Sequence, residues 1–463
     1  MIIVYLILSL LAAGAVMLPK GRTGVKIVSM AFCALQAGMA AYVILRDWGG
    51  SGWLFRFDPL GTLFFTIMAV IAPLVVWSGW NYLRDESLRH FKYYHLFLLL
   101  LCTAVSGLYF ADNLAVTWIF AEATTLCTAG LVYHRRGARS LEATWKYLFV
   151  CSVGIAIAYL GILLLSTAGV DGGFTYAALT ARIAQGNPLY MKIAFLFIFV
   201  GYSCKMEVFP LYTVGVDANS AAPSPASVLI STALVNGGFL AIYRVVKIFE
   251  QSPVYPWTGG VMIVAGIASV LLGTLFMRRT NNYKRLLAYS TVENMGIVLI
   301  GLGIGGVGVF AALLHLTAHS LIKSGLFLQV ARIGSGYGTY RINRIGGLMA
   351  ADPLGAVTMI ILAVLLLAFP PSPLFFSEVL VFSGAITGGR WWIVAVLVLL
   401  VCIVIYNFFT RVLRLCYKPA AAQWNPVGGP AVRWVPLALG VLAICLGVWQ
   451  GGVFVEFLNA IVR

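Results

Sequence analysis

The chain has 463 residues, of which 61% are hydrophobic and only 10% are charged. A soluble protein needs far more charge to cover its surface, so this composition excludes an ordinary soluble domain and indicates a polytopic membrane protein. The net charge of +16 would suit a nucleic-acid-binding protein, but the basic residues are distributed over many loops, which excludes that class.

Apolar stretches of near-spanning length follow one another along the whole chain. In order, the fourteen stretches are about residues 2–19, 25–46, 60–83, 91–110, 113–133, 146–168, 190–216, 225–249, 258–278, 284–303, 307–331, 353–387, 391–417 and 432–459. The seventh and the twelfth are long and are interrupted by proline. We therefore expect an all-α fold of about 14 transmembrane helices, two of them broken, without an extramembrane domain.

The basic residues predict the orientation of these helices. Of the 31 Lys and Arg residues, 21 lie in loops that follow odd-numbered helices and seven lie in even-numbered loops. By the positive-inside rule, the odd loops are cytoplasmic and both termini lie outside. Such loops also favour contact with anionic lipid.

Ionisable residues inside the expected spans are the main functional signal. They are Glu122, Lys205, Glu207, Glu293, Lys323 and Glu378. A charge at the bilayer centre costs roughly 2.5–3.5 kcal/mol on insertion scales, so it is rarely accidental. His315 and His319 precede Lys323 at a spacing of i, i+4, i+8, which places all three on one helix face. This pattern predicts a path for protons or small cations.

Each of these residues also has a plainer reading, and the alternatives stay open. Glu122 is either a partner for Lys205 or a carboxylate satisfied by neighbouring Thr hydroxyls, and Glu207 either carries protons or stabilises the helix break. The two histidines either relay protons, pack in the core or bind metal, although no third ligand lies nearby in the sequence. The eight cysteines are scattered singly without a CxxC motif. We expect no catalytic residue, no cofactor site and no metal site.

Two segments of the chain have the same arrangement of helices, buried ionisable residues and proline breaks. Glu122 and Glu293 each lie ten positions into the second helix of a five-helix unit, and Lys205 and Glu378 each lie beside the proline break of the fourth. The separations nearly match, since 205 − 122 = 83 and 378 − 293 = 85. A unit with an odd number of helices is followed by a copy that enters from the opposite face, so we expect an inverted repeat.

The expected organisation therefore has four parts. They are residues 1–90 with helices 1–3, residues 91–249 with the first repeat (helices 4–8, broken helix 7), residues 258–417 with the second repeat (helices 9–13, broken helix 12), and residues 418–463 with helix 14.

At these residues the chain resembles a known family, the antiporter-like proton-translocating subunits of respiratory complex I, Mrp-type cation/proton antiporters and membrane-bound hydrogenases. It is most similar to the F-type subunits of hydrogenase-4 and formate hydrogenlyase complexes. The segments that carry the resemblance are WIFAEATTL around Glu122, SLEATWKYL around Lys146, GYSCKMEVFPLYTVGVDANSAAPSP around Lys205, NNYKRLLAYSTVENMG around Glu293, LLHLTAHSLIKSGLF around Lys323 and PPSPLFFSEVLVFSG around Glu378.

The resemblance implies a fourteen-helix fold and a role for each matching residue. The family's glutamate–lysine pair falls on Glu122 and Lys205, and its exit-side acid falls on Glu378. The family's central hydrophilic axis falls on His315, His319 and Lys323. Glu293 matches the hydrogenase-type variant of the tenth-helix motif, and Lys146 lies in a matching segment.

Two departures from the family fall on the first half. Complex I relatives often have a lysine in the eighth helix where this chain has Asn236, so the relay between the halves would depend on water or on Glu207. Where relatives favour WLPDAHSEAP, this chain has VGVDANSAAP from Val214 to Pro223, so the histidine and one of the two acids of that pattern are missing.

The resemblance implies a proton- or cation-translocating subunit of a redox-driven complex, without catalysis of its own. Its partners would be other membrane subunits, an iron–sulfur or hydrogenase-like peripheral arm and anionic lipid, in a bacterial or archaeal plasma membrane; no nucleic-acid partner is expected. Two alternatives stay open: a subunit of a multi-subunit sodium/proton antiporter and a non-pumping scaffold. The sequence does not distinguish H⁺ from Na⁺, nor an NADH:quinone oxidoreductase-like from a hydrogenase-like complex.

Overall fold

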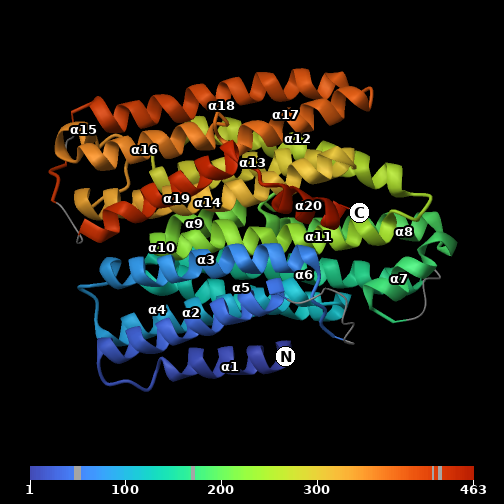
Figure 1. The fold of residues 1–463 in the computed structure, drawn as a ribbon, viewed down its shortest axis with the longest axis horizontal. Coiled ribbons are helices and arrows are strands. Elements are labelled where there is room, and N and C mark those ends of the chain that lie inside the picture. The colour runs from blue at the N-terminus through green and yellow to red at the C-terminus, as the bar shows by residue number, and fades with distance from the viewer. Residues whose placement is uncertain (46–53, 168–172, 420–421, 426–429, 463) are drawn as a thin grey trace. The chain divides into compact units, whose positions relative to one another are not determined.

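The computed structural model describes residues 1–45, 54–167, 173–419, 422–425 and 430–462. Arg46, Ala168 and Arg463, which belong to the expected elements, lie outside the described residues. The described part is helical, and its extended backbone is limited to isolated bridges. The prediction of an all-α membrane protein is confirmed (Figure 1).

The chain divides into two compact units, residues 1–226 with 233–261 and residues 227–232 with 262–463. The helices before the second unit are α1 (Ile2–Ala15), α2 (Arg22–Leu45), α3 (Pro59–Tyr82), α4 (Leu88–Phe110), α5 (Leu114–Val132), η1 (Tyr133–Arg135), α6 (Ala138–Thr167), α7 (Tyr176–Arg182), η2 (Ile183–Gln185), α8 (Pro188–Met206) and α9 (Thr213–Ala221). Those around the two chain crossings are α10 (Ser224–Leu229), η3 (Ile230–Leu234), α11 (Val235–Phe249) and α12 (Tyr255–Arg279). The second unit continues with α13 (Tyr283–Ile304), α14 (Val307–Tyr337), α15 (Leu348–Ala351), α16 (Pro353–Leu366), α17 (Pro373–Thr387), α18 (Trp391–Tyr417), α19 (Pro430–Val448) and α20 (Gly452–Val462).

Polar caps explain where several of these helices begin. The side chain of Asp58 accepts from the Gly61 N–H at 2.9 Å, and Asn113 and Asn282 cap α5 and α13 in the same way. Ser372 caps α17 at 3.2 Å, directly before a proline at the first helical position. Such caps satisfy N–H groups that lipid cannot bind, so they fix the ends of membrane helices.

In the first unit, α8 packs along α6 over most of its length. The contact is close because glycine lies in it: a Cβ at Gly201 would come within 2.5 Å of the Cβ of Ala158, and one at Gly161 within 2.7 Å of the Ala194 oxygen. Small residues let membrane helices approach in this way. The approach sets the separation of the polar side chains on these two helices.

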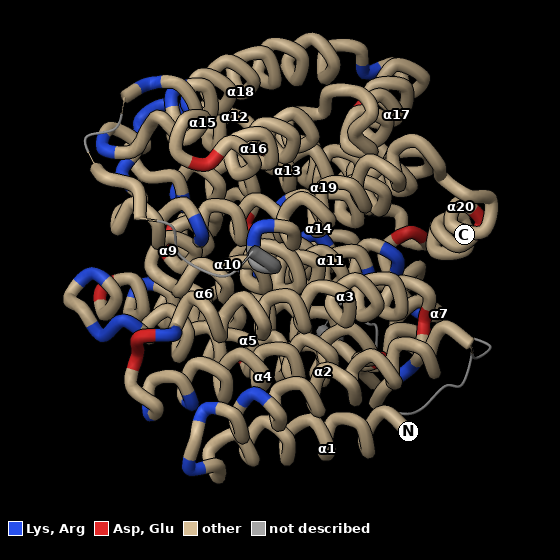
Figure 2. Tube along the Cα trace, turned by 60° about the vertical axis from the view of Figure 1, so that its left-hand side comes forward, with Lys and Arg blue, Asp and Glu red and all other residues tan. Residues whose placement is uncertain are grey.

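In the second unit, α14 is the central helix, and α13, α16, α17 and α19 pack around it. His315, His319 and Lys323 on this helix are completely buried. They are therefore surrounded by protein rather than by lipid, which is the environment that an ionisable residue in a membrane requires. In Figure 2, by contrast, most Lys and Arg residues lie where helices end.

Among the described residues, eleven helices are long and apolar enough to cross a membrane, or up to twelve if the bent pair α19 and α20 is one span. The expected stretches 190–216 and 353–387 are each divided into two helices, as their prolines predict. The expected last span, 432–459, is also divided: α19 and α20 meet at 81° around Gly451 and Gly452. Glycine has a low helix propensity, which accounts for the bend.

Both proline breaks contain a residue other than glycine in the left-handed backbone region. Glu207 has φ +59° directly after α8, and Ala368 has φ +53° directly after α16. Such conformations cost energy and concentrate at functional sites. The two breaks are therefore candidate functional positions.

Candidate functional site

The first cluster joins Glu122 of α5 to Lys205 of α8 through a hydroxyl group. Nζ of Lys205 donates to Oγ1 of Thr125 at 2.6 Å, and the same hydroxyl donates to Oε2 of Glu122 at 3.2 Å. Oγ of Ser152 on α6 donates to Oε1 of Glu122 at 2.7 Å. The acid and the base thus lie on one hydrogen-bonded chain without touching directly.

Burial makes this chain of contacts energetically important. Lys205 is only 1% exposed, whereas Glu122 is half-buried. The ring of Tyr147, which is also buried, lies 5.7 Å from Nζ of Lys205. Removing one partner of a buried charge costs about 3–5 kcal/mol, so the ammonium depends on these few neighbours.

Glu207 lies at the helix break and is held by the following helix. Its carboxylate is 2% exposed, and Nδ2 of Asn219 on α9 donates to its Oε1 at 2.9 Å. Gly215 leaves the room for this carboxylate, since a Cβ there would collide with the Glu207 side chain. Asn219 therefore connects α9 to the residue that ends α8.

The two remaining first-half candidates lie in different environments. Lys146 has a 55% exposed side chain and pairs with Glu142 one turn away at 2.5 Å. Asn236 on α11 is completely buried. An exposed ion pair of this kind contributes little energy, which makes Lys146 the weaker candidate of the two.

The second cluster is organised around His315 of α14. Its Nε2 lies 3.1 Å from Oδ1 of Asn294, and its Nδ1 lies 2.9 Å from Oγ of Ser377. Asn294 also donates from Nδ2 to Oε2 of Glu293 at 2.6 Å. Because both ring nitrogens have hydrogen-bond partners, this histidine is a poor metal ligand.

Lys323 and His319 complete the polar face of α14. Nζ of Lys323 donates to the Leu287 carbonyl at 2.5 Å and to Oγ of Ser290 at 2.6 Å, both on α13. His319 is completely buried, and neither of its ring nitrogens has a hydrogen-bond partner among the described residues. Glu378 follows Ser377 directly in the sequence and is half-buried.

The sequence identifies the charges but not the neutral groups between them. These are Ser152, Ser290, Asn294 and Ser377. Serine and asparagine are tolerated in membrane helices for packing and backbone bonding, so a single sequence gives no reason to select them. The available signal was position: Ser290 and Asn294 lie three residues before and one after Glu293.

Buried acids and bases joined by hydrogen bonds, within helices long enough to span a membrane, define a polytopic membrane protein of the ion-transport class. The family model described as NADH:quinone oxidoreductase/Mrp antiporter, TM, matches residues 111–404. The chain belongs to this family of antiporter-like membrane subunits, and the resemblance noted in the sequence is confirmed.

Individual relatives agree with this assignment. The chain is 31% identical over 347 residues to a hydrogenase-4 component F homolog of Methylacidiphilum infernorum, covering 72% of this chain and 73% of the relative. It is 27% identical over 413 residues to NADH-quinone oxidoreductase subunit N of Desulforudis audaxviator, covering 85% and 81%. A chain of the membrane-bound sulfane sulfur reductase, an archaeal respiratory membrane complex, has the same fold, with a TM-score of 0.89, 21% identity and coverage of 100% and 96%.

Proposed function

We propose that this chain moves protons, or small cations, across the membrane as one subunit of a redox-driven complex. The observation that carries the proposal is the chain of contacts from Lys205 through Thr125 to Glu122, since a buried base and acid joined by one hydroxyl can exchange a proton. The partners would be other membrane subunits and an iron–sulfur or hydrogenase-like peripheral arm. The names of the hydrogenase-4 and NADH-quinone oxidoreductase relatives support this choice.

In the first cluster, Thr125 acts as the relay. Its oxygen accepts a proton from the Lys205 ammonium while its own proton passes to the Glu122 carboxylate, and Ser152 steadies that carboxylate from the other side. The product is a neutral amine and a neutral acid. A charge or water brought near the pair by a change elsewhere in the complex would move the proton between them and so load or discharge the cluster.

In the second cluster, the Ser377 hydroxyl can follow the protonation state of His315. Asn294 donates through its amide nitrogen to Glu293 and to the Ser290 carbonyl, so its oxygen must accept from Nε2–H of His315. In neutral His315, Nδ1 then accepts from Ser377. When Nδ1 gains a proton it donates to Ser377, whose hydroxyl turns to the Leu374 carbonyl 2.7 Å away.

His319 and Glu378 extend this relay in the proposed path. A buried imidazole whose two nitrogens lack protein partners calls for ordered water, and water between Lys323 and His315 would carry protons along α14. Glu378, one residue beyond Ser377, would release them. Glu293, which is connected to His315 through Asn294, would store a proton between transfers.

Glu207 compensates for the altered loop in this proposal. The segment lacks the histidine and one of the two acids that relatives favour, and in the structure it forms helix α9, which carries Asn219. Because Asn219 donates to the carboxylate of Glu207, this acid is held between α8 and α9, two residues from Lys205. It would supply protons to Lys205 from the cytoplasmic side, with Asn236 serving as a neutral polar neighbour.

The proposed arrangement in the membrane has about fourteen spans. Residues 91–249 and 258–417 form inverted repeats, with residues 1–90 before them and residues 418–463 after them. Both termini lie outside a bacterial or archaeal plasma membrane, and the basic odd loops contact anionic lipid. The similar positions of the two helix breaks support the repeat, since each break combines proline with a left-handed residue.

The decisive experiment measures proton uptake by inverted vesicles that contain the intact complex. Lys205→Ala should abolish uptake while electron transfer by the soluble partners continues. Lys192→Ala is the matched control, because Lys192 lies on the same helix but is half-buried against Trp257. Normal uptake by Lys205→Ala would refute the proposal.

The alternative of a sodium/proton antiporter is favoured by one finding. The chain is 28% identical to the Na(+)/H(+) antiporter subunit A1 of Staphylococcus aureus, of which it covers 41%. Purification distinguishes the two: iron–sulfur or hydrogenase-like partners indicate the redox complex, whereas sodium-dependent proton movement without them indicates the antiporter. A chain that assembles normally but whose Lys205 and Lys323 variants lose nothing would be a scaffold.

A further inference from the structure

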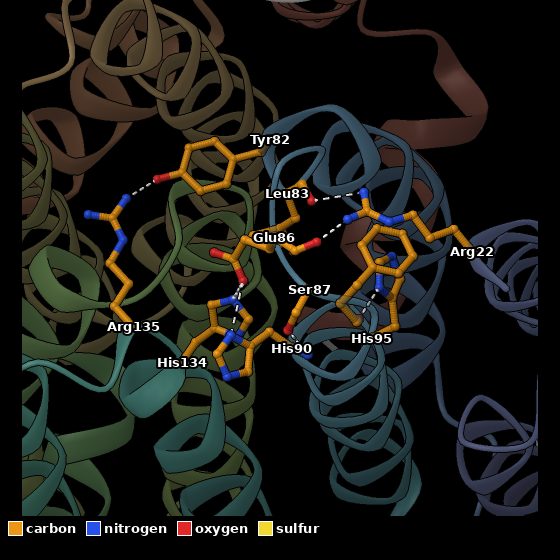
Figure 3. A network of polar contacts seen from close by, with 10 residues as sticks. Arg22, Tyr82, Leu83, Glu86, Ser87, His90, His95, His134 and Arg135 are labelled. Atoms are coloured by element: carbon orange, nitrogen blue, oxygen red, sulfur yellow. Dashed lines mark hydrogen bonds and ion pairs between the residues drawn. The ribbon is translucent and has the colours of Figure 1, made fainter. Parts of the chain in front are cut away.

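A third polar cluster, apart from those around Lys205 and His315, lies in the first unit, where α3 and α5 end and α4 begins. Figure 3 shows the Glu86 carboxylate pointing toward the rings of His134 and His90. Oε2 of Glu86 lies 2.8 Å from Nε2 of His134 and 4.0 Å from Nδ1 of His90. Arg22 donates from the other side to the Leu83 and Glu86 carbonyls. One carboxylate thus holds the His134 imidazole by a hydrogen bond and lies near a second imidazole, that of His90, at the ends of these helices.

A cavity of about 170 Å³ opens beside these histidines, between α4 and η1. His90, His134 and Arg136 supply its cationic or protonatable groups, and Tyr93, Tyr133 and Phe97 supply its aromatic walls. The guanidinium carbons of Arg136 and Arg89 lie 6.0 Å and 5.6 Å from the centre of the Tyr93 ring. This stacking holds positive charge at the rim of the cavity.

The lining changes from charged to apolar along the helices. On α4, His90, Tyr93 and Phe97 are spaced i, i+3 and i+7 and so share one face, with the histidine nearest the helix end. On the other side, Gly130 lies one turn deeper than His134 and faces Phe97. A free anion would need polar groups throughout, whereas this gradient matches a molecule with an anionic head and an apolar body.

We propose that this cavity binds the headgroup of an anionic phospholipid, with the phosphate at Arg136 and His90 and the glycerol and upper acyl chain against Phe97 and Gly130. The position at the ends of α4 and α5 corresponds to headgroup depth. Such a lipid would join the two helices on their cytoplasmic side. This inference rests on the proposed orientation of the basic loops, but its test reads lipid binding and does not depend on proton movement.

The test uses native mass spectrometry of the full-length protein in detergent, with equal amounts of phosphatidylglycerol and phosphatidylcholine of the same acyl chains. Wild type should retain phosphatidylglycerol preferentially. Arg136→Asn should lower that preference about fivefold, the effect of one cation at an anionic surface; asparagine also tolerates the left-handed backbone at this position. Arg139→Asn, which removes an equal charge just outside the cavity, should leave the preference unchanged.

Two further arms separate lipid binding from simple charge attraction and from a phosphate site. Phe97→Ala keeps every charge but removes the apolar wall, and it should also reduce retained phosphatidylglycerol. Inorganic phosphate at millimolar concentration should not displace the lipid; displacement would identify a phosphate site and overturn the proposal. An equal loss in Arg139→Asn, or no loss in Arg136→Asn and His90→Gln, would overturn it as well. Thermal unfolding of each variant shows whether it is folded.

Discussion

The polar clusters around Lys205 and His315 provide hydrogen-bond partners for their buried ionisable residues in different ways. In the first unit, the base Lys205 and the acid Glu122 are connected, within the described part of the chain, by the hydroxyl of Thr125. In the second unit, His315 lies between Asn294 and Ser377, which are both neutral and can each be satisfied in more than one way. In the proposed proton path, the first arrangement depends on one hydroxyl, whereas the second depends on two neutral side chains. The first should therefore be the more fragile of the two.

The largest expected effect extends this comparison to one ion pair in each unit. Arg332 and Asp352 in the second unit lie 2.5 Å apart and are 4% and 5% exposed, whereas Arg244 and Asp58 in the first lie 2.9 Å apart and are 10% and 23% exposed. Asp352→Ala should lower the free energy of unfolding by about 3–5 kcal/mol, because it leaves a buried guanidinium without its carboxylate.

Asp58→Ala should cost less, because Arg244 still donates to the carbonyls of Tyr109 and Ala111 at 2.7 Å and 2.6 Å. Its loss of the α3 cap adds about 1 kcal/mol, which leaves the total below that of Asp352→Ala. Thermal unfolding in detergent measures both variants. Equal losses of stability would show that the contribution of these ion pairs does not depend on how deeply they are buried. Arg332→Met combined with Asp352→Leu should recover much of the stability, because it removes both charges.

The second expected effect is on proton uptake through the first cluster. Thr125→Val keeps the shape of the side chain but removes the hydroxyl between Lys205 and Glu122, so uptake should fall about a hundredfold, the lower range for loss of a positioned proton-transfer group. Thr124→Val is the control, because the Thr124 hydroxyl donates to the Ala121 carbonyl at 2.7 Å. Similar rates in the two variants would contradict the relay, and Thr125→Ser should restore most of the activity.

A smaller effect is expected in the second cluster. Ser377→Ala removes one partner of His315 and leaves Asn294 in place, so uptake should fall only about tenfold, equivalent to one neutral hydrogen bond of roughly 1–1.5 kcal/mol. Ser383→Ala, an exposed position on the same helix, is the control. A loss as large as that of Thr125→Val would show that the second cluster is as fragile as the first.

The smallest effect concerns an acid outside the spans. Burial acts to raise the pKa of the Glu86 carboxyl, but the hydrogen bond and charge of His134, with the charges of His90 and Arg135, outweigh it and hold this pKa below its usual range. A carboxyl of this kind adds stability that is complete above its unfolded pKa and is lost as the pH falls through the folded value.

Glu86→Gln should therefore reduce stability near neutral pH by less than about 1 kcal/mol, since the side chain is partly exposed, and should flatten the loss on acidification below about pH 4.3. Thermal unfolding as a function of pH checks this, and His134→Gln should remove the same part of the profile. If Glu86→Gln loses stability on acidification to the same extent as wild type, other carboxyls determine that loss.

The sequence predicted the membrane fold, the family and both helix breaks because each depends on a strong local signal. Proline removes a backbone donor, and Lys205 or Glu293 in an apolar stretch is conspicuous by its cost. The bend between α19 and α20 was missed because the stretch 432–459 is apolar throughout and its glycines resemble ordinary packing residues. Helix α7 was missed because it is only seven residues long.

The contacts inside the clusters required the structure. Nothing local indicates that Ser377, 62 residues away, would meet His315, or that Asn219 would hold Glu207. These pairs arise from the packing of α14 against α17 and of α9 against α8, which hydropathy does not encode. Long-range pairing of neutral side chains is thus the part of a site that a single sequence conceals.

The double role of Thr125 has a consequence for heavy water. Because its oxygen accepts from Lys205 while its hydroxyl donates to Glu122, a transfer by the proposed relay would move two hydrogens together. Both of these positions exchange with solvent. In mixtures of H₂O and D₂O, the rate of a step limited by this relay therefore follows the square of a linear function of the deuterium fraction and lies below the straight line that joins its values in the two pure solvents. A lysine that passed its proton through a single bond would give a straight line.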